Sequence, residues 1–504
     1  MAQETIDLLI IGGGINGAGI ARDAAGRDLA VLVCEQGDLG GATSSASSKL
    51  IHGGLRYLEK YAFRLVKEAL SEREVLLKSA PHLIFPLDFV LPCARNTRSA
   101  WMLGLGLWLY DHLGGTRQFS ASRAIDLHQS EYGKALKREF AHGFVYSDCR
   151  VDDARLVIAN MLGAQKLGAR VLPRTRCVSA RRDGKFWQAR LEQGNECIEV
   201  RAKALINAAG PWVRSLFDDV IEQRTEHNVR LVKGSHIVIP RRYSGEHAYL
   251  LQNYDQRVVF VIPFQDRFTL IGTTDISFQG DPATVSASNS EIEYLCEAVN
   301  RYFRDAVYPS EVVWHYSGVR ALYDDGRANP SDVSRDYRLI LETDDMRHLP
   351  LLSIYGGKIT TYRKLAEAAL KNLEPWLLPA KSPWTAHQPL PGGNIPGADF
   401  ERFVAGLEEI YPKLPRTFLR ELASRHGSLI EDVLGDAHDT SELGENFGAG
   451  LFAREVDYFI DHEWARSAED ILWRRSKTGL FLGSAQKQAL ERYVFNKLAR
   501  IGFH

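Results

Sequence analysis

The sequence IDLLIIGGGING occupies residues 6–17 and decides the fold. Its apolar half predicts a buried strand, and its glycines predict a tight turn into a helix that runs from residue 15 to about residue 26. Gly12, Gly14 and Gly17 have the spacing of the dinucleotide-binding fingerprint, in which missing side chains let the turn close and the backbone approach a pyrophosphate. The helix N-terminus would offer unpaired N–H groups and the positive end of a dipole to that diphosphate.

A second apolar run, residues 30–34, ends at Glu35 and completes a strand–helix–strand unit. An acid at this position can accept hydrogen bonds from both ribose hydroxyls, so it favours FAD or NAD over NADP, whose additional phosphate it would repel. Glycine turns between a strand and a helix also serve packing alone. The strand, helix, second strand and acid together indicate a bound dinucleotide.

The stretch TSSASSKLIHGGLRY, residues 43–57, combines hydroxyls, two cations and a pair of glycines. A solvated serine-rich loop would explain its first half but not its second. Through GGGINGAGIARD (residues 12–23) and SSKLIHGGLRYL (residues 47–58), the sequence resembles the FAD-dependent glycerol-3-phosphate dehydrogenase family, in particular its bacterial aerobic, respiratory type. The resemblance extends from residue 6 to about residue 475.

The turn after the first helix departs from the family pattern. The family usually has Arg-Gly there, whereas Arg27 is followed by Asp28 in this chain. Because Gly26 remains available to cap the helix, we expect a small local change in the turn and no loss of cofactor.

The resemblance also implies which other segments hold FAD. The flavin would lie against NAAGPW (residues 207–212), although a structural Gly-Pro turn is a fair alternative. GGKITTYRKLA (residues 356–366) repeats the glycine turn and helix start, and its helix N-terminus can stabilise negative charge on a reduced flavin. We assign cofactor binding to Gly12, Gly14, Gly17, Glu35, Thr43, Ser44, Ser45, Lys49, His52, Gly53, Ala209, Gly210, Gly357, Lys358, Ile359 and Thr360.

The predicted fold class is α/β. A Rossmann-like FAD-binding domain would comprise residues 1–80, 150–228 and 345–375. Short runs of alternating apolar and polar residues between 229 and 341 predict an inserted, mostly antiparallel β-sheet substrate domain, residues 81–149 and 229–344. A proline-rich linker, residues 376–397, would lead to a helical C-terminal domain, residues 398–504.

Composition limits the classes of partner. The 504 residues carry a net charge of −1, so we expect no nucleic acid partner. The six cysteines are scattered without metal-ligand spacing, and the N-terminus lacks the pattern of a signal peptide. We therefore expect reduced thiols, no metal site and a cytoplasmic location.

The longest apolar stretch, AWMLGLGLWLY at residues 100–110, has about half the length of a membrane-spanning helix. It is either a core helix or an interfacial helix with tryptophans beside Arg95 and Arg98. The resemblance implies a monotopic enzyme, peripherally associated with the inner face of the cell membrane, that reaches ubiquinone or a similar quinone. A homodimer is compatible with the sequence.

The resemblance implies oxidation of sn-glycerol 3-phosphate to dihydroxyacetone phosphate by hydride transfer to FAD, with electrons passed to the quinone. For the base we favour His236, because an imidazole titrates near neutral pH, although a hydrogen-bonded sheet histidine is the alternative. Guanidinium groups and lysines suit a phosphate dianion, and Arg320 could also polarise the developing ketone. The expected substrate-site residues are His236, Arg320, Arg56, Tyr57, Thr274, Arg335 and Lys358.

Three other functions stay open from the sequence. An oxidase of the same fold could return electrons to oxygen, and an amine oxidase could act on an amino acid, although the number of candidate phosphate cations argues against the latter. A non-enzymatic flavin-binding sensor is the third.

Overall fold

The computed structural model describes the chain except for residues 1–3, 56–57, 59–60, 94–99, 115–118, 222, 224, 256, 325, 327–335, 345, 347 and 503–504. Three predicted substrate ligands, Arg56, Tyr57 and Arg335, lie outside the described residues and stay predictions, as do the arginines beside the 100–110 stretch.

The first sheet forms the nucleotide-binding layer. Its order is β17-β18-β10-β1-β2-β7, with β9 and β8 continuing from β10. The strands around β1 run parallel, and β17 is antiparallel to β18. The bounds are β1 Glu4–Ile11, β2 Val31–Glu35, β7 Arg170–Pro173, β8 Arg176–Asp183, β9 Phe186–Gln193, β10 Glu196–Asn207, β17 Arg338–Glu342 and β18 Leu351–Tyr355.

Both faces of this sheet are covered, which explains the continuous apolar run of β1. Leu8 and Ile10 face a core shared with α1 (Ile15–Gly26), α4 (Asp153–Lys166) and α7 (Tyr362–Leu377). Leu9 and Ile11 face a second core with β8, β9 and α5 (Val213–Leu216). The predicted Rossmann-like domain is confirmed.

The C-terminal end of α1 differs from the prediction that Gly26 caps it. Gly26 is the last helical residue, and Asp28 adopts the left-handed conformation with φ of 63°. Aspartate tolerates this region better than most residues. Gly26 has another function, because a Cβ there would lie 2.2 Å from the Trp384 ring.

The second sheet is mostly antiparallel, as predicted, with the order β15-β11-β14-β13-β12-β4-β6-β3. Strand β16 pairs with β11, β5 pairs with β6, and β4 runs parallel to β12. The bounds are β3 Leu50–Ile51, β4 Ile84–Pro92, β5 Arg123–Asp126, β6 His142–Val151, β11 Val229–Pro240, β12 Ala248–Gln252, β13 Val258–Phe264, β14 Phe268–Gly272, β15 Ile276–Ser277 and β16 Trp314–Tyr323.

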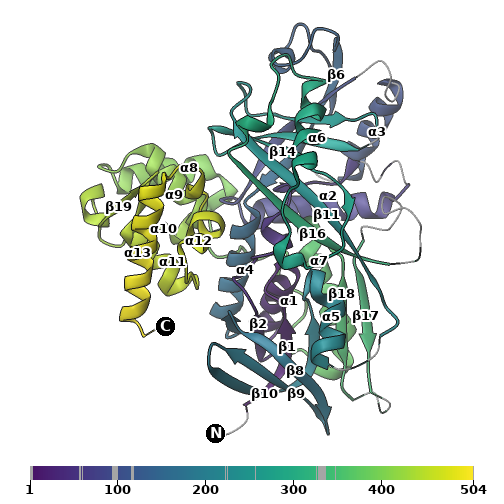
Figure 1. Cartoon of the computed structure of the whole chain (residues 1–504), viewed down its shortest axis with the longest axis vertical. Coiled ribbons are helices and arrows are strands. Elements are labelled where there is room, and N and C mark those ends of the chain that lie inside the picture. The colour runs from purple at the N-terminus through teal and green to yellow at the C-terminus, as the bar shows by residue number, and fades with distance from the viewer. Residues whose placement is uncertain are drawn as a thin grey trace.

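Helices cover both faces of the second sheet. Helix α6 (Asn289–Asn300) packs on one side, and α2 (Phe63–Ser79) and α3 (Ala100–Leu113) pack on the other. Figure 1 shows this sheet above the nucleotide sheet, with β11 and β16 descending between the two layers. The strands that carry His236 and Arg320 therefore stand over the nucleotide turn.

Three element boundaries differ from the predicted domain ranges. Strand β17 belongs to the nucleotide sheet although residues up to 344 were expected in the substrate domain. Strand β3 pairs in the second sheet although it falls within residues 1–80. Helix α7 continues through Pro375 to Leu377, past the predicted start of the linker.

The C-terminal part is helical and contains α8 Phe400–Ile410, α9 Arg416–His426, α10 Ile430–Leu434, α11 Ala453–His462, α12 Ala468–Asp470 and α13 Ser484–Arg500, with the short strands β19 Asn446–Gly448 and β20 Leu451–Phe452. It has its own apolar core and lies beside α4 (Figure 1). Two buried ion pairs fix the contact, Asp38 with Arg475 and Arg155 with Glu463. The buried Lys477 adds a third pair with the partly exposed Asp152.

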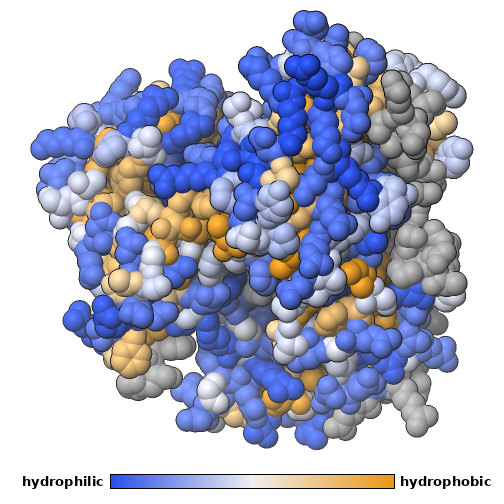
Figure 2. Space-filling view, turned by 45° about the horizontal axis from the view of Figure 1, so that its top comes forward, coloured by the Kyte–Doolittle hydropathy of each residue, from blue (hydrophilic) through white to orange (hydrophobic). Residues whose placement is uncertain are grey.

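Figure 2 shows one face of the molecule, which is mostly hydrophilic with smaller groups of apolar side chains between. None of the helices among the described residues is long and apolar enough to cross a membrane.

Candidate active site

The glycines of the first turn are required by close backbone approaches. Gly12 has φ of 116°, and a Cβ there would lie 2.4 Å from the carbonyl oxygen of Ala208. A Cβ at Gly17 would lie 2.0 Å from the carbonyl oxygen of Gly12, so Gly17 lets α1 pack against the turn. Gly14 has no side chain to cap α1, and the first helical N–H, that of Ile15, donates to the Ser44 hydroxyl at 2.9 Å. Gly14, Ile15 and Asn16 line the cavity, so the positive end of the helix dipole is available to attract an anion there.

The second strand ends at a carboxylate held by the backbone. The two oxygens of Glu35 accept hydrogen bonds from the N–H groups of Gly13 at 2.6 Å and Gly37 at 2.8 Å. Burial raises the pKa of Glu35, and these hydrogen bonds oppose that shift. Each carboxylate oxygen keeps a further lone pair, so Glu35 can still accept hydrogen bonds from ribose hydroxyls.

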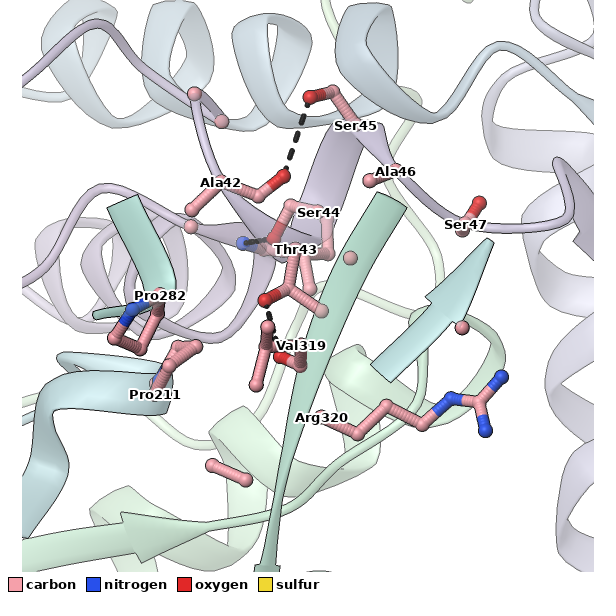
Figure 3. A pocket seen from close by; sticks show the side chains of 18 of the residues that line it. Ala42, Thr43, Ser44, Ser45, Ala46, Ser47, Pro211, Pro282, Val319 and Arg320 are labelled. Carbon is pink, nitrogen blue, oxygen red and sulfur yellow. Dashed lines mark hydrogen bonds between the residues drawn. The ribbon is translucent and has the colours of Figure 1, made fainter. Parts of the chain in front are cut away.

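A cavity of about 1220 Å³ extends from this turn to the second sheet. Figure 3 shows residues 42–47 on one side of it and β16 on the other, with Thr43 donating to the carbonyl of Val319 at 2.6 Å. The structure brings these predicted site residues to its wall: Gly12, Gly14, Glu35, Thr43, Ser44, Ser45, His52, Ala209, Gly210, His236, Arg320, Gly357, Lys358, Ile359 and Thr360.

Four predicted residues support the wall without lining it. Besides Gly17, they are Lys49, Gly53 and Thr274. Lys49 is buried and pairs with Asp153 at 2.7 Å. The N–H of Gly53 donates to the Tyr110 hydroxyl at 2.8 Å.

Thr274 is fully buried behind the wall. Its hydroxyl accepts from the Ser235 N–H at 2.9 Å and donates to Glu291 at 2.8 Å. The neighbouring Thr273 is the residue of this pair that lines the cavity. Thr274 therefore does not contact the substrate directly in this geometry.

His236 lies between two strands that fix its ring. On β16 the ring of Tyr316 stacks on it, with centroids 4.9 Å apart and an interplanar angle of 14°. On β14 its neighbour is Gly272, where a Cβ would lie 2.0 Å from His236 Cδ2. Burial, together with the positive charges of Lys49 and Arg320, holds the pKa of His236 well below its usual value. The imidazole is therefore neutral at physiological pH and able to accept a proton.

Arg320 faces the same side of the sheet as His236. His236 is opposite Tyr316 and Arg320 is opposite Val232, so each strand places the two positions four residues apart, an even spacing that keeps both on one face. Gly234 lies between them, and a Cβ there would be 3.1 Å from Nη2 of Arg320. The guanidinium thus folds back over Gly234 toward the histidine.

Asp275 holds the Arg320 guanidinium, with Nη1 at 3.1 Å from its carboxylate oxygen. Arg320 and Lys358 bring positive charge to the cavity wall, where charge-assisted hydrogen bonds to an anionic substrate can form.

Sequence reasoning missed Asn16, Ser48, Tyr316 and Asp275. Asn16 donates to the carbonyl of Gly356 at 3.1 Å. It therefore joins the glycine turn at residues 12–14 to the glycine turn at residues 356–357. The asparagine in the first turn of α1 was a usable signal, because asparagine is a weak helix former away from the cap. Asp275 lies next to a predicted residue, whereas Tyr316 becomes visible only through strand pairing.

The residues fit a dinucleotide on structural grounds. The glycine cradle is closed to any side chain, the α1 N-terminus lies at the cavity wall, and Asn16 Oδ1 is buried there without a hydrogen-bond partner among the described residues. A polar atom left unsatisfied in this way is suited to a ligand donor.

Comparison with known proteins identifies the dinucleotide. The family described as "FAD dependent oxidoreductase" matches residues 7–363. The chain belongs to this family. FAD is therefore the cofactor of this oxidoreductase, as predicted, and residues 383–497 match a second family, described as the C-terminal domain of alpha-glycerophosphate oxidase.

Several relatives of this FAD-dependent oxidoreductase are similar over almost their whole length. A glycerol-3-phosphate dehydrogenase from Pseudomonas aeruginosa is 51% identical, over 97% of this chain and 95% of the relative. The aerobic glycerol-3-phosphate dehydrogenase of Escherichia coli is 49% identical over 98% of both chains. A D-erythritol 1-phosphate dehydrogenase from Brucella abortus is 48% identical, again over 98% of both.

A solved structure supports the fold. The glycerol-3-phosphate dehydrogenase of Bacillus halodurans, complexed with FAD, superposes with a TM-score of 0.79 at 26% identity, covering 100% of this chain and 92% of the other.

Proposed function

We propose that this protein oxidises sn-glycerol 3-phosphate to dihydroxyacetone phosphate with FAD, and that a membrane quinone receives the electrons. The observation that carries the proposal is the placement of a neutral, buried His236 and the guanidinium of Arg320 on one face of β11 and β16, in the cavity that also contains the nucleotide turn. The relatives named as glycerol-3-phosphate dehydrogenases support the choice of substrate.

His236 is the group that receives the proton of the substrate hydroxyl, because its imidazole is held neutral and fixed between two strands. FAD, when bound, supplies the acceptor for the hydride of the carbinol carbon. The residues suited to hold the cofactor are Glu35 at the ribose, the N–H groups at the start of α1 at the diphosphate, and the segment from Gly356 to Thr360 at the far end of the cavity.

Arg320 and Lys358 orient the substrate through its phosphate, as predicted also for Arg56, Tyr57 and Arg335. A guanidinium offers paired N–H donors that match phosphate oxygens, and a lysine adds a point charge. The same cations draw charge away from the developing ketone when they approach its oxygen.

D-Erythritol 1-phosphate is a second candidate substrate, because a relative with that name is 48% identical to this chain. Both compounds combine a phosphate with a neighbouring secondary alcohol. The cation wall and His236 suit either, and the number of carbons beyond the reacting alcohol distinguishes them.

Anaerobic titration of the purified FAD-loaded protein tests the proposal. We expect glycerol 3-phosphate to bleach the flavin absorbance, and glycerol and an amino acid to leave it unchanged. Stronger bleaching by D-erythritol 1-phosphate would assign the second substrate. A flavin that stays oxidised with both phosphates, or that responds equally to glycerol, would refute an assignment to polyol phosphates.

The electron acceptor needs a separate measurement. We expect anaerobic turnover with a soluble ubiquinone analogue and little peroxide in air. Rapid stoichiometric peroxide formation without quinone turnover would instead assign an oxidase.

Helix α3 is the segment we propose to contact the membrane. Leu103, Leu107 and Tyr110 pack inward, yet the outward face is also apolar, with Trp101 71% and Trp108 54% exposed. Exposed tryptophans on a short helix suit the headgroup region of a bilayer. We expect W101E/W108E to reduce sedimentation with anionic lipid vesicles at least tenfold while flavin reduction by substrate is retained. Equal sedimentation of both proteins would exclude α3.

A further inference from the structure

Ser48 lies beside His236, the catalytic base of the proposed function, and both residues line the cavity. Its hydroxyl oxygen is 2.9 Å from Nε2 of His236, and Ser48 itself lines the cavity. The other ring nitrogen, Nδ1, is buried and has no hydrogen-bond partner in the part of the chain that the structure describes. Neither nitrogen therefore presents a free lone pair to the cavity.

We propose that Ser48 is a catalytic proton relay that passes the substrate hydroxyl proton to His236. The inference rests on the proposed function. As the substrate O–H bond breaks, its proton forms a new bond to Ser48 Oγ, and the proton already on Ser48 moves to Nε2 of His236. The hydride of the same carbon goes to the bound FAD, so the alcohol loses two electrons and becomes a ketone, and the histidine ends as an imidazolium.

The segment around Ser48 is held rigidly enough for this function. Asp153 accepts hydrogen bonds from the Ser47 N–H at 3.2 Å, from the Ser47 hydroxyl at 2.7 Å and from Lys49 Nζ at 2.7 Å. Ser48 lies between these two clamped residues. A hydroxyl fixed at hydrogen-bond distance needs little reorganisation when the protons move.

The imidazole of His236, which receives the proton, is connected through Tyr316 to the same loop segment, residues 47–49. Tyr316 stacks on His236 and donates its hydroxyl to the carbonyl of Ser47 at 2.8 Å. Lys49 Nζ lies 5.0 Å from the Tyr316 ring centroid and binds the carbonyl of Ser45 at 2.9 Å. Any shift of the loop would therefore move the ring and the hydroxyl together, which preserves their distance.

The experiment compares anaerobic flavin reduction by glycerol 3-phosphate in the FAD-loaded wild type, Ser48→Ala, Ser48→Thr and Ser424→Ala. Ser424 is a matched control, because its hydroxyl binds only a backbone carbonyl on α9, outside the cavity wall. We expect Ser48→Ala to slow reduction about 100-fold, within the range of general acid–base catalysis. The flavin spectrum and substrate Kd should be unchanged, Ser48→Thr should recover most of the rate, and Ser424→Ala should equal the wild type.

A proton inventory distinguishes a relay from a structural function. Reduction rates in H₂O/D₂O mixtures should depend quadratically on deuterium fraction in the wild type, because two protons move together, and linearly in Ser48→Ala. A Ser48→Ala rate within threefold of the wild type would overturn the relay. So would a slow variant that also loses FAD or substrate affinity. If the wild type itself is not reduced, the proposed function fails instead.

Discussion

Gly272 is predicted to control the position of the base. A Cβ there would lie 2.0 Å from His236 Cδ2 and 2.7 Å from Nε2, so Gly272→Ala must push the imidazole away from Ser48. We expect kcat to fall at least tenfold at nearly unchanged KM, with a stability loss of about 1–3 kcal/mol from overpacking. Stopped-flow flavin reduction and substrate titration check this. Wild-type kinetics would show that the ring position is unimportant.

Gly234 should have the complementary effect on the cation. A Cβ there would lie 3.1 Å from Arg320 Nη2 and 2.6 Å from the Thr273 hydroxyl, which forces the guanidinium off its position. We expect Gly234→Ala to raise KM for the phosphate ester about tenfold or more, because a charge-assisted hydrogen bond contributes about 1.5–3 kcal/mol. Kinetics at constant ionic strength measure it. A change in kcat alone would contradict an anchoring function for Arg320.

The site residues that could be predicted from the sequence are those that belong to a local motif. Gly12 and Glu35 belong to one strand–helix–strand unit, and both line the cavity as expected. Ser48 and Tyr316 could not be assigned a function, because both meet His236 only through long-range contacts. Tyr316 reaches the imidazole through the pairing of β11 with β16, and Ser48 lies 188 residues before His236 in the chain.

At the level of elements, the end of α1 yields a prediction about Gly26. Replacing glycine by alanine inside a helix normally stabilises it by about 0.5–1 kcal/mol. Here the added Cβ would lie 2.2 Å from the Trp384 ring, whose Nε1 donates to the carbonyl of Asp23 at 3.2 Å. We expect Gly26→Ala to lower Tm by several degrees, since overpacking costs about 1–3 kcal/mol. Thermal denaturation of the FAD-loaded wild type and variant measures this difference in Tm. An unchanged or raised Tm would contradict the close packing of Gly26 against Trp384.

Most strands and helices could be predicted, because apolar periodicity and glycine turns are local signals. The exceptions have tertiary causes. Helix α7 passes through Pro375 because the proline lies in its last turn, where its missing N–H removes a single hydrogen bond, to the carbonyl four residues earlier. The helix ends at Leu377, and Leu378 caps it with φ of 44°. Strand β17 joins the nucleotide sheet by antiparallel pairing with β18. The sequence between the two strands contains no pattern that predicts this pairing.

For the whole molecule, the sequence predicted a Rossmann-like domain, an inserted sheet and helical C-terminal part, and these are confirmed. It did not predict how the C-terminal part docks. The contact depends on buried charges, among them Asp38 with Arg474 and Arg475, and Arg155 with Glu463. Each charge is unremarkable in sequence, because aspartates and arginines are usually solvated.

Asp38 therefore should couple the C-terminal part to the nucleotide-binding loop. Burial opposes ionisation, but the guanidiniums of Arg475 and Arg474 hold the pKa of Asp38 at about 2. Because this pKa lies below its unfolded value, the pair stabilises the fold above about pH 4 and is lost as pH falls toward 2. Asp38→Asn removes the carboxylate partner of the buried Arg475, whereas Arg474 keeps its ion pair with Asp470. Breaking a buried pair costs about 3–5 kcal/mol.

We expect Asp38→Asn at pH 7 to lower Tm, to speed proteolytic cleavage in the 378–397 linker and to release FAD more readily, since Asp38 and Arg474 both line the cavity. The wild type should lose stability between about pH 4 and pH 2, with a smaller loss in Asp38→Asn because it lacks the titrating group. Arg454→Gln is the matched control, because it removes an ion pair with the exposed Asp436 within the C-terminal part itself. If Asp38→Asn were cleaved no faster than this control, the buried pair could not be what holds the two parts together.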